Sequence, residues 1–177
     1  RDALEGKIYG IEPGNDGNQL IQKMIDTDAF GLGDFDLIAS SEAGMLTQVR
    51  AMTKNDEWLV FLGWEPHPMN TVYDITYLSG GDDYFGPNYG AATVHTLTRP
   101  GYVEENPNFG RFFNNLEFTL AMENEIMKAI ADGADAMDAA RTWLEENPSI
   151  MEKWFAGVKA VNGEDALPVA LENMGIE

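Results

Sequence analysis

Two stretches of the sequence carry polar and aromatic side chains in an arrangement suited to holding a small ligand. The first is residues 13–18 (PGNDGN), a turn-rich loop between a strand-like run and a helix-like run. Backbone N–H groups at a helix start, together with the side chains of Asn15 and Asp16, can hydrogen-bond a polar ligand group. The same two side chains can instead cap the helix, and the residue types alone favour the cap.

The second stretch is residues 64–68 (WEPHP), which directly follows the apolar run 58–63 (WLVFLG). An uninterrupted apolar run predicts a strand buried on both faces of a parallel sheet. Trp64 then lies at the carboxyl end of that strand, where open α/β sheets bind their ligands. Trp also offers the strongest aromatic face for a cation. From the residues alone, ligand contact and packing are equally good interpretations of Trp64.

Covalent and metal chemistry are poorly supported. The chain has no cysteine and two histidines, His67 between two prolines and His95 in a strand-like run, for which structural roles are the better interpretation. Residues 80–83 (GGDD) lack the alternating oxygen ligands of an EF-hand and are expected to form a solvated acidic turn. The 13–18 loop lacks a P-loop lysine and the order GxGxxG. We therefore expect no catalytic residue, metal or cofactor, and a protein that is not an enzyme.

Composition narrows the classes of partner. The 177 residues include 30 acidic and 11 basic side chains, giving a formal charge of −19. This charge repels nucleic acid and anionic membranes, so we expect no nucleic-acid partner. Hydrophobic residues make up 44% of the chain, which excludes a disordered acidic tail.

The elements that must position the two loops follow an α/β rhythm. Strands are predicted at 7–12, 35–39 and 58–63, with helices following the 13–18 loop and Ser41. This alternation is typical of crossover units in an α/β fold. Further β-like pieces occur at 73–78 and 92–98.

The second half of the sequence is helical in pattern. Apolar stripes run through 111–130, 136–144 and 150–155, with a stop at Asn147-Pro148. The change of character predicts a ligand-binding α/β part over 1–98 and a helical C-terminal segment over 99–177. The apolar surface of these stripes is larger than a small sheet can bury, so we expect the helices to pack against a further surface.

At the two loops the sequence resembles bacterial ABC-importer substrate-binding proteins for choline and glycine betaine. The resemblance is most specific over residues 7–18 and 61–70, and the choline-binding branch is the more similar. It continues through 77–83, 92–96, 122–127 and 143–148, and therefore spans nearly the whole chain.

The resemblance implies a periplasmic protein of two lobes (type II) that closes over a quaternary ammonium group held in a box of aromatic rings. Trp64 matches the box tryptophan of the second lobe, and Asn15 matches the asparagine that hydrogen-bonds the ligand's polar end. Gly14 and Asp16 are further loop positions where contacts are expected. The implied partners are a small quaternary ammonium ligand, the membrane permease of the importer and an N-terminal lobe.

The resemblance also implies what the chain lacks. In the family, most of the first lobe precedes the strand that begins at Lys7, and it supplies the other box aromatics. The chain is therefore expected to be one lobe followed by C-terminal helices that belong with the missing first lobe. Glycine betaine and trimethylamine N-oxide stay open as alternative ligands, as does a truncated lobe that acts only in self-association.

Overall fold

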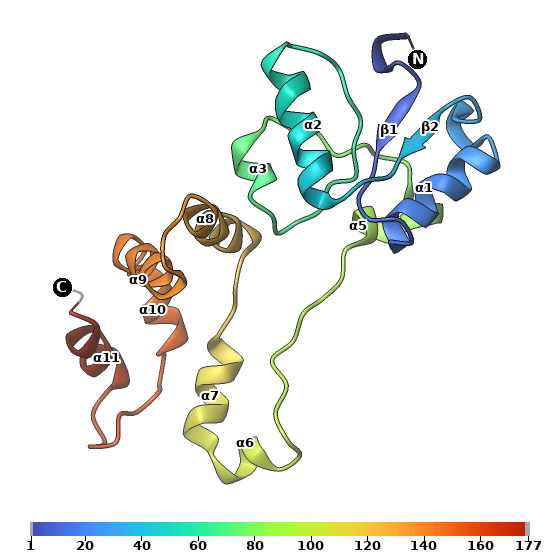
Figure 1. Ribbon diagram of the computed structural model, residues 1–177. Helices are drawn as coiled ribbons and strands as arrows, with labels where there is room; N and C mark the ends of the chain where they lie inside the picture. Colours follow the sequence, from blue (N-terminus) through green and yellow to red (C-terminus); the bar gives the residue numbers. More distant parts are fainter. Residues whose placement is uncertain (1, 176–177) are drawn as a thin grey trace. The chain divides into compact units, whose positions relative to one another are not determined.

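The computed structural model describes residues 2–175, which form two compact units (Figure 1). Unit 1 comprises the described residues of 1–64 and 76–92, and unit 2 those of 65–75 and 93–177. These sets differ from the expected 1–98 and 99–177 segments, which stay a prediction about the lobes of the protein.

Unit 1 is built around three parallel segments. Strands β1 (Lys7–Tyr9) and β2 (Asp36–Ile38) pair in parallel with Ile8 opposite Leu37. On the other side of β1, the Tyr9 N–H donates to the Val60 carbonyl at 2.9 Å, and the Leu62 N–H donates to the Tyr9 carbonyl at 2.8 Å. β1 is therefore the central segment, and the carboxyl ends of all three lie at one edge.

Two helices of unit 1 begin at side-chain caps. Helix α1 (Asp16–Asp26) starts after Asn15, and α2 (Glu42–Lys54) starts after Ser41, whose hydroxyl accepts from the Gly44 N–H at 3.0 Å. Ile21 and Ile25 of α1 are buried with Ile8 of β1 and form the core of this unit. Short helical turns complete it: η1 (Asp2–Leu4), η2 (Ala29–Gly31), α4 (Asp82–Phe85) and α5 (Pro87–Gly90).

Three β predictions are wrong for the described chain. Run 58–63 is not a strand buried on both faces: its one ladder contact is the bridge between Phe61 and Tyr9, and Trp58 is 73% exposed. Pieces 73–78 and 92–98 contain no strand, and Val94 is 94% exposed. A strand needs a ladder partner, and among residues 2–175 none pairs with these two pieces.

Unit 2 is helical, as the pattern predicted, but the predicted 111–130 helix is broken. Helix α7 (Pro107–Asn115) ends before residues 116–119, and α8 (Leu120–Ala131) restarts where the Thr119 hydroxyl accepts from the Met122 N–H at 3.2 Å. Helix α9 (Ala136–Glu146) ends before Asn147-Pro148, as expected. The remaining helices are α3 (Met69–Val72), α6 (Tyr102–Glu105), α10 (Ser149–Trp154) and α11 (Ala166–Met174).

Two side chains of α7, one helical turn apart, bind the segment after α10. Arg111 Nη1 donates to the Gly157 carbonyl at 2.6 Å, and Asn115 Nδ2 donates to the Ala156 carbonyl at 3.0 Å. Trp154 is buried here, and its indole N–H donates to the Glu117 carbonyl at 3.1 Å. Within residues 2–175, none of the helices has the length and apolar character that a membrane crossing requires.

Candidate ligand site

Two of the three parallel segments of unit 1 lead directly to the predicted ligand residues. Strand β1 continues into the loop that carries Asn15, and segment 60–62 continues through Gly63 to Trp64. Because parallel segments run in one direction, both loops leave the sheet at the same edge. The structure thus brings Asn15 and Trp64 to the edge at which open α/β sheets bind ligands.

Close packing holds the two loops near each other. A Cβ atom on Gly17, in the first turn of α1, would lie 2.8 Å from Leu62 Cδ2, so only a glycine fits there without a shift of that leucine. Leu62 lies two residues before Trp64. The start of α1 therefore packs against the segment that leads to Trp64.

Asn15 is half-buried and caps α1. Its Oδ1 accepts a hydrogen bond from the Gly17 N–H at 2.8 Å, which is the alternative use weighed from the sequence. Among the described residues, no acceptor is bonded to the Asn15 Nδ2 group. The cap therefore occupies the acceptor half of the amide and leaves two N–H donors for an oxygen of a ligand.

Gly14 and Asp16 flank this cap. Gly14 has φ of +90° with open space around the position of a Cβ, and its carbonyl accepts from Gln19 Nε2 at 2.8 Å. A positive φ is a conformation that glycine adopts without strain, so Gly14 shapes the turn. Asp16 is exposed in the first turn of α1, where a carboxylate complements the helix dipole.

Trp64 is half-buried, and Tyr77, an aromatic residue that sequence reasoning missed, lies beside Gly63. Tyr77 Oη would lie 3.6 Å from a Cβ on Gly63, the residue before Trp64. The Tyr77 ring also lies 6.1 Å from the ring of Tyr89 at 59°. The β-like pattern of 73–78 directed attention to a strand instead of to this tyrosine.

Sequence reasoning also missed two asparagines. Among residues 2–175, Asn18 and Asn124 are the buried polar residues, at 4% and 6% exposure. Asn18 binds the backbone of the loop before Asn15, and Asn124 binds the His67 N–H at 2.7 Å within unit 2. His67 Nδ1 accepts from the Met69 N–H at 3.1 Å, which agrees with the structural role expected for this histidine.

Residues 1–146 match OpuAC, the substrate-binding domain of ABC-type glycine betaine transport systems. The chain belongs to this family. The expected resemblance is thereby confirmed, and so is the expectation of a binding protein and not an enzyme.

Two solved structures and one further protein are similar to the chain. A structure of an ABC-transporter choline-binding protein in complex with choline is 54% identical with a TM-score of 0.68, over 98% of this chain and 61% of that one. Lactococcal OpuAC complexed with glycine betaine is 27% identical with a TM-score of 0.63, over 85% of this chain and 57% of that one. The glycine betaine/carnitine transport binding protein GbuC of Listeria monocytogenes serotype 1/2a (strain 10403S) is 30% identical over 164 residues, 93% of this chain and 54% of GbuC.

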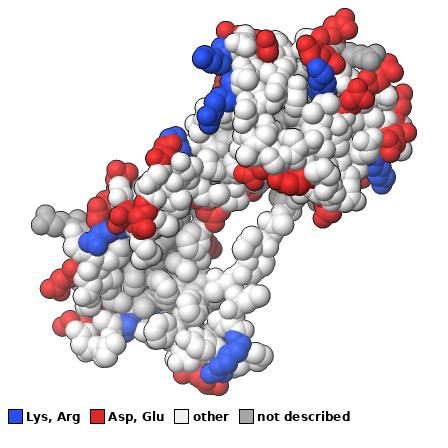
Figure 2. Space-filling view, in the orientation of Figure 1, with Lys and Arg blue, Asp and Glu red and all other residues white. Residues whose placement is uncertain are grey.

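This chain therefore spans between half and two thirds of the length of the relatives it matches. Its α/β and helical units correspond to 54–61% of their chains. On the face drawn in Figure 2, acidic side chains are spread over the surface and basic ones are scattered. This distribution agrees with the net charge of −19.

The shifted pKa values lie in exposed ion pairs outside the two loops. Hydrogen bonding and attraction to Lys7 lower the pKa of Glu5, and the same pairing raises the pKa of Lys7. A hydrogen bond from Arg99 lowers the pKa of the Glu105 carboxyl. In residues 2–175, no three His, Asp or Glu side chains are grouped to hold a metal ion.

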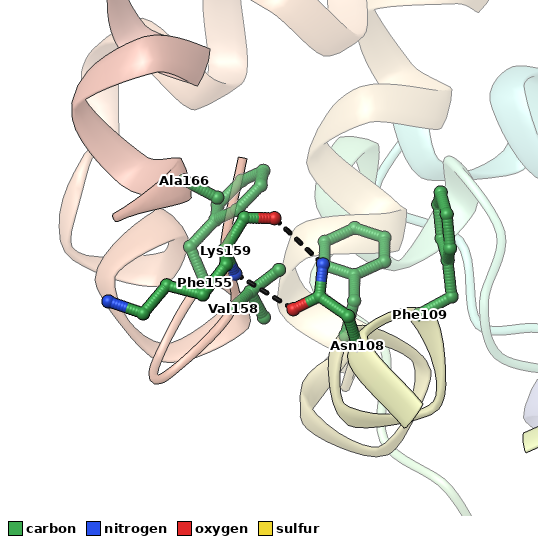
Figure 3. Close-up of a pocket in the computed structure, with 7 residues that line it drawn as sticks. Asn108, Phe109, Phe155, Val158, Lys159 and Ala166 are labelled. Carbon is green, nitrogen blue, oxygen red and sulfur yellow. Dashed lines mark hydrogen bonds between the residues drawn. The ribbon is translucent and has the colours of Figure 1, made fainter. Parts of the chain in front are cut away.

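Unit 2 contains an apolar cavity of about 200 Å³ (Figure 3). Asn108 closes one side through a reciprocal pair, with its Nδ2 donating to the Lys159 carbonyl at 2.7 Å and its Oδ1 accepting from the Lys159 N–H at 2.8 Å. Binding sites for drug-sized ligands are about 300–1,000 Å³ with polar groups free to meet the ligand. This cavity is smaller and its amide is already paired, so we interpret it as a packing feature. Its other lining residues are Phe109, Phe112, Phe155, Val158 and Ala166.

Proposed function

We propose that the chain is part of the substrate-binding component of an ABC importer and contributes Trp64 and Asn15 to a choline site. The observation that carries the proposal is the placement of both residues at one edge of three parallel segments. The Trp64 indole is proposed as one wall of an aromatic box around the quaternary ammonium. The mechanism is desolvation of the methylated cation between aromatic faces, without covalent chemistry.

The polar end of the ligand is assigned to Asn15. Because the cap uses Oδ1, the amide meets the ligand through N–H groups, which suit the hydroxyl oxygen of choline. The same donors suit a glycine betaine carboxylate or the oxide of trimethylamine N-oxide, so Asn15 alone does not discriminate. Choline is favoured because the 54% identity to a choline-binding protein exceeds the 27% and 30% identities to the glycine betaine relatives.

The remaining parts of the proposal concern the whole protein. We propose that residues 1–98 belong to one lobe of a two-lobe binding protein and that 99–177 pack toward the other lobe. We also propose a periplasmic location and a permease partner, and membership of the OpuAC family supports both. Gly14 shapes the ligand loop, and Asp16 is a further contact at its rim.

Binding energies set the affinity expected of this chain by itself. Micromolar affinity corresponds to about 8 kcal/mol. A cation–π contact contributes roughly 0.5–2 kcal/mol, and a hydrogen bond between the neutral amide and the choline hydroxyl about 0.5–1.5 kcal/mol. Trp64 and Asn15 together therefore fall short, and the chain is expected to bind choline in the millimolar range or more weakly.

Calorimetric titration with choline, glycine betaine and trimethylamine N-oxide tests this proposal. We expect no heat from micromolar ligand and weak binding of choline in preference to the other two at millimolar concentration. Preference for glycine betaine would reassign the ligand. Equal, non-saturating signals from all three that are unchanged in Trp64→Ala would overturn the site.

Self-association is a second candidate function, favoured by exposed apolar side chains in unit 2. Met137 is 79% and Leu97 88% exposed, and exposed apolar side chains that gather into a patch mark protein–protein contacts. We propose that these surfaces pair between copies if ligand binding is lost. Sedimentation velocity across a range of concentrations tests this, since a constant sedimentation coefficient would exclude it.

A further inference from the structure

Asn18 is a buried polar residue on the apolar face of α1. It shares that face with Ile21 and Ile25, three and seven residues further on, both of which pack in the core of unit 1. A buried amide is destabilising unless its hydrogen-bonding groups are satisfied. The hydrogen-bond partners of Asn18 must therefore offset the cost of burying its amide.

All of these partners belong to the loop that precedes Asn15. Asn18 Oδ1 accepts from the Ile11 N–H at 3.1 Å, and Nδ2 donates to the Ile11 carbonyl at 2.9 Å and to the Glu12 carbonyl at 3.1 Å. One acceptor and both donors of the amide are thus engaged. The pattern requires an asparagine, because an aspartate in its ionised form has no donor for the two carbonyls.

One carbonyl links Asn18 directly to the ligand residue. The Glu12 carbonyl that accepts from Asn18 Nδ2 also accepts from the Asn15 N–H at 3.1 Å. Asn15 in turn orients its side chain on the Gly17 N–H. The buried amide therefore fixes the turn from Ile11 to Asn15, and that turn decides where the Asn15 N–H groups point.

Gly10 provides the space for this arrangement. A Cβ atom at residue 10 would lie 2.3 Å from Asn18 Oδ1 and 2.9 Å from its Cγ. Real Cβ atoms do not approach so closely, so Asn18 would have to leave its three partners. The hydrogen bonds of Asn18, inside α1, therefore depend on a glycine at position 10, directly after β1.

We propose that Asn18 is the positioning residue of the ligand loop and acts on the ligand only through Asn15. The inference rests on the proposed function, in which Asn15 contacts choline. If it holds, loss of Asn18 weakens choline binding because Asn15 is misdirected, and the loss is not independent of Asn15.

A ligand-free measurement tests the structural half of this inference. The Gly17 N–H is bonded to Asn15 Oδ1, so its hydrogen-exchange rate reports the orientation of the Asn15 side chain. In Asn18→Ala, Gly17 exchange is expected to rise about tenfold relative to the Ile25 amide of the same helix. The control is Gln22→Ala, an exposed residue of α1 whose Nε2 donates to Asp26 at 2.8 Å, and no such rise is expected there.

Each outcome of the exchange experiment supports or overturns the role of Asn18 in holding the loop. An equal rise at Gly17 and Ile25 would make Asn18 a general stability residue and overturn the proposal. If Asn18→Ala does not fold, Asn18→Asp keeps the volume and the acceptor for Ile11 while losing both donors, and the same local rise is expected. Loss of folding in both variants would also overturn the proposal.

A double-mutant cycle on choline affinity tests the functional half. Asn18→Ala is expected to weaken choline binding severalfold in the native background and to have no effect in an Asn15→Ala background. Equal losses in the two backgrounds would contradict action through Asn15. If Asn15→Ala alone leaves affinity unchanged, the proposed function fails, while the exchange result still decides whether Asn18 holds the loop.

Discussion

Asn15 Oδ1 and the Gly17 N–H lie 2.8 Å apart and form the cap of α1. This contact decides which part of the Asn15 amide a ligand can use. Capping and ligand binding are not competing roles here, because the cap uses the oxygen and leaves the nitrogen. Sequence reasoning weighed the two as alternatives, whereas the structure allows both in one side chain.

Separation of the two roles is the first prediction. Asn15→Asp keeps the capping oxygen, and Asn and Asp are similar N-caps, so the unfolding free energy is expected to change by less than about 0.5 kcal/mol. The variant loses both N–H donors and repels a carboxylate, so glycine betaine affinity is expected to fall roughly tenfold or more, whereas choline can donate its hydroxyl to the new carboxylate and is expected to keep its affinity. Urea unfolding and NMR titration measure the effects on stability and on binding. Unchanged glycine betaine affinity in Asn15→Asp would exclude the amide as the ligand donor.

Trp64 is predicted to act through its aromatic face. Trp64→Phe is expected to weaken choline binding modestly and Trp64→Ala more strongly, within the roughly 0.5–2 kcal/mol of a cation–π contact. Trp58→Phe is the matched control, because Trp58 is 73% exposed in the same unit. Equal effects of Trp58→Phe and Trp64→Phe on the dissociation constant would count against a specific box.

The local elements followed from the sequence because their signals are local. Turn residues and a capping Ser41 predicted the start of α2, and Asn147-Pro148 predicted the end of α9. The break at 116–119 was missed because Leu116 continues the apolar stripe of α7, and stripes do not reveal where a cap interrupts them. Run 58–63 was predicted as a strand buried on both faces because it is apolar throughout. Apolar content favours burial, but it does not show that a second strand is present to pair with the run.

The candidate site was predicted only in part. Trp64 and Asn15 were selected by their loops and by family resemblance, and the common sheet edge supports that selection. Asn18 left a signal that was not used: a polar residue in register with Ile21 and Ile25 on the apolar face of α1. Asn124, four residues after Leu120 and three before Met127, interrupts a stripe in the same way.

Gly10 is predicted to tolerate no side chain. In Gly10→Ala the new Cβ would displace Asn18, and overpacking of this kind destabilises by about 1–3 kcal/mol. Gly63→Ala is the control, because the nearest atom to its Cβ would be 3.6 Å away. Thermal unfolding of the two variants checks the difference, and equal midpoints would refute the close approach.

Asn124 is predicted to hold the turn at residues 65–69 of unit 2. Its Oδ1 accepts from the His67 N–H at 2.7 Å, and its Nδ2 donates to Glu65 Oε1 at 3.4 Å. Asn124→Ala leaves the His67 N–H without this acceptor, which is expected to destabilise the unit by about 1–3 kcal/mol and to speed exchange of that amide. Asn173→Ala, at an exposed helical asparagine, serves as the control. Unaltered His67 exchange would contradict the assignment.

An NMR titration of the chain with choline tests the central claim most directly. Among the four tryptophan indole N–H signals, those of Trp64 and Trp58 are assigned with Trp64→Phe and Trp58→Phe, and the Asn15 side-chain amide is assigned with Asn15→Asp. We predict that millimolar choline shifts the Trp64 indole and Asn15 amide signals together along one saturable curve, while the Trp58 signal stays fixed. Shifts confined to other residues, or no saturable shift of Trp64, would contradict a choline site at this sheet edge.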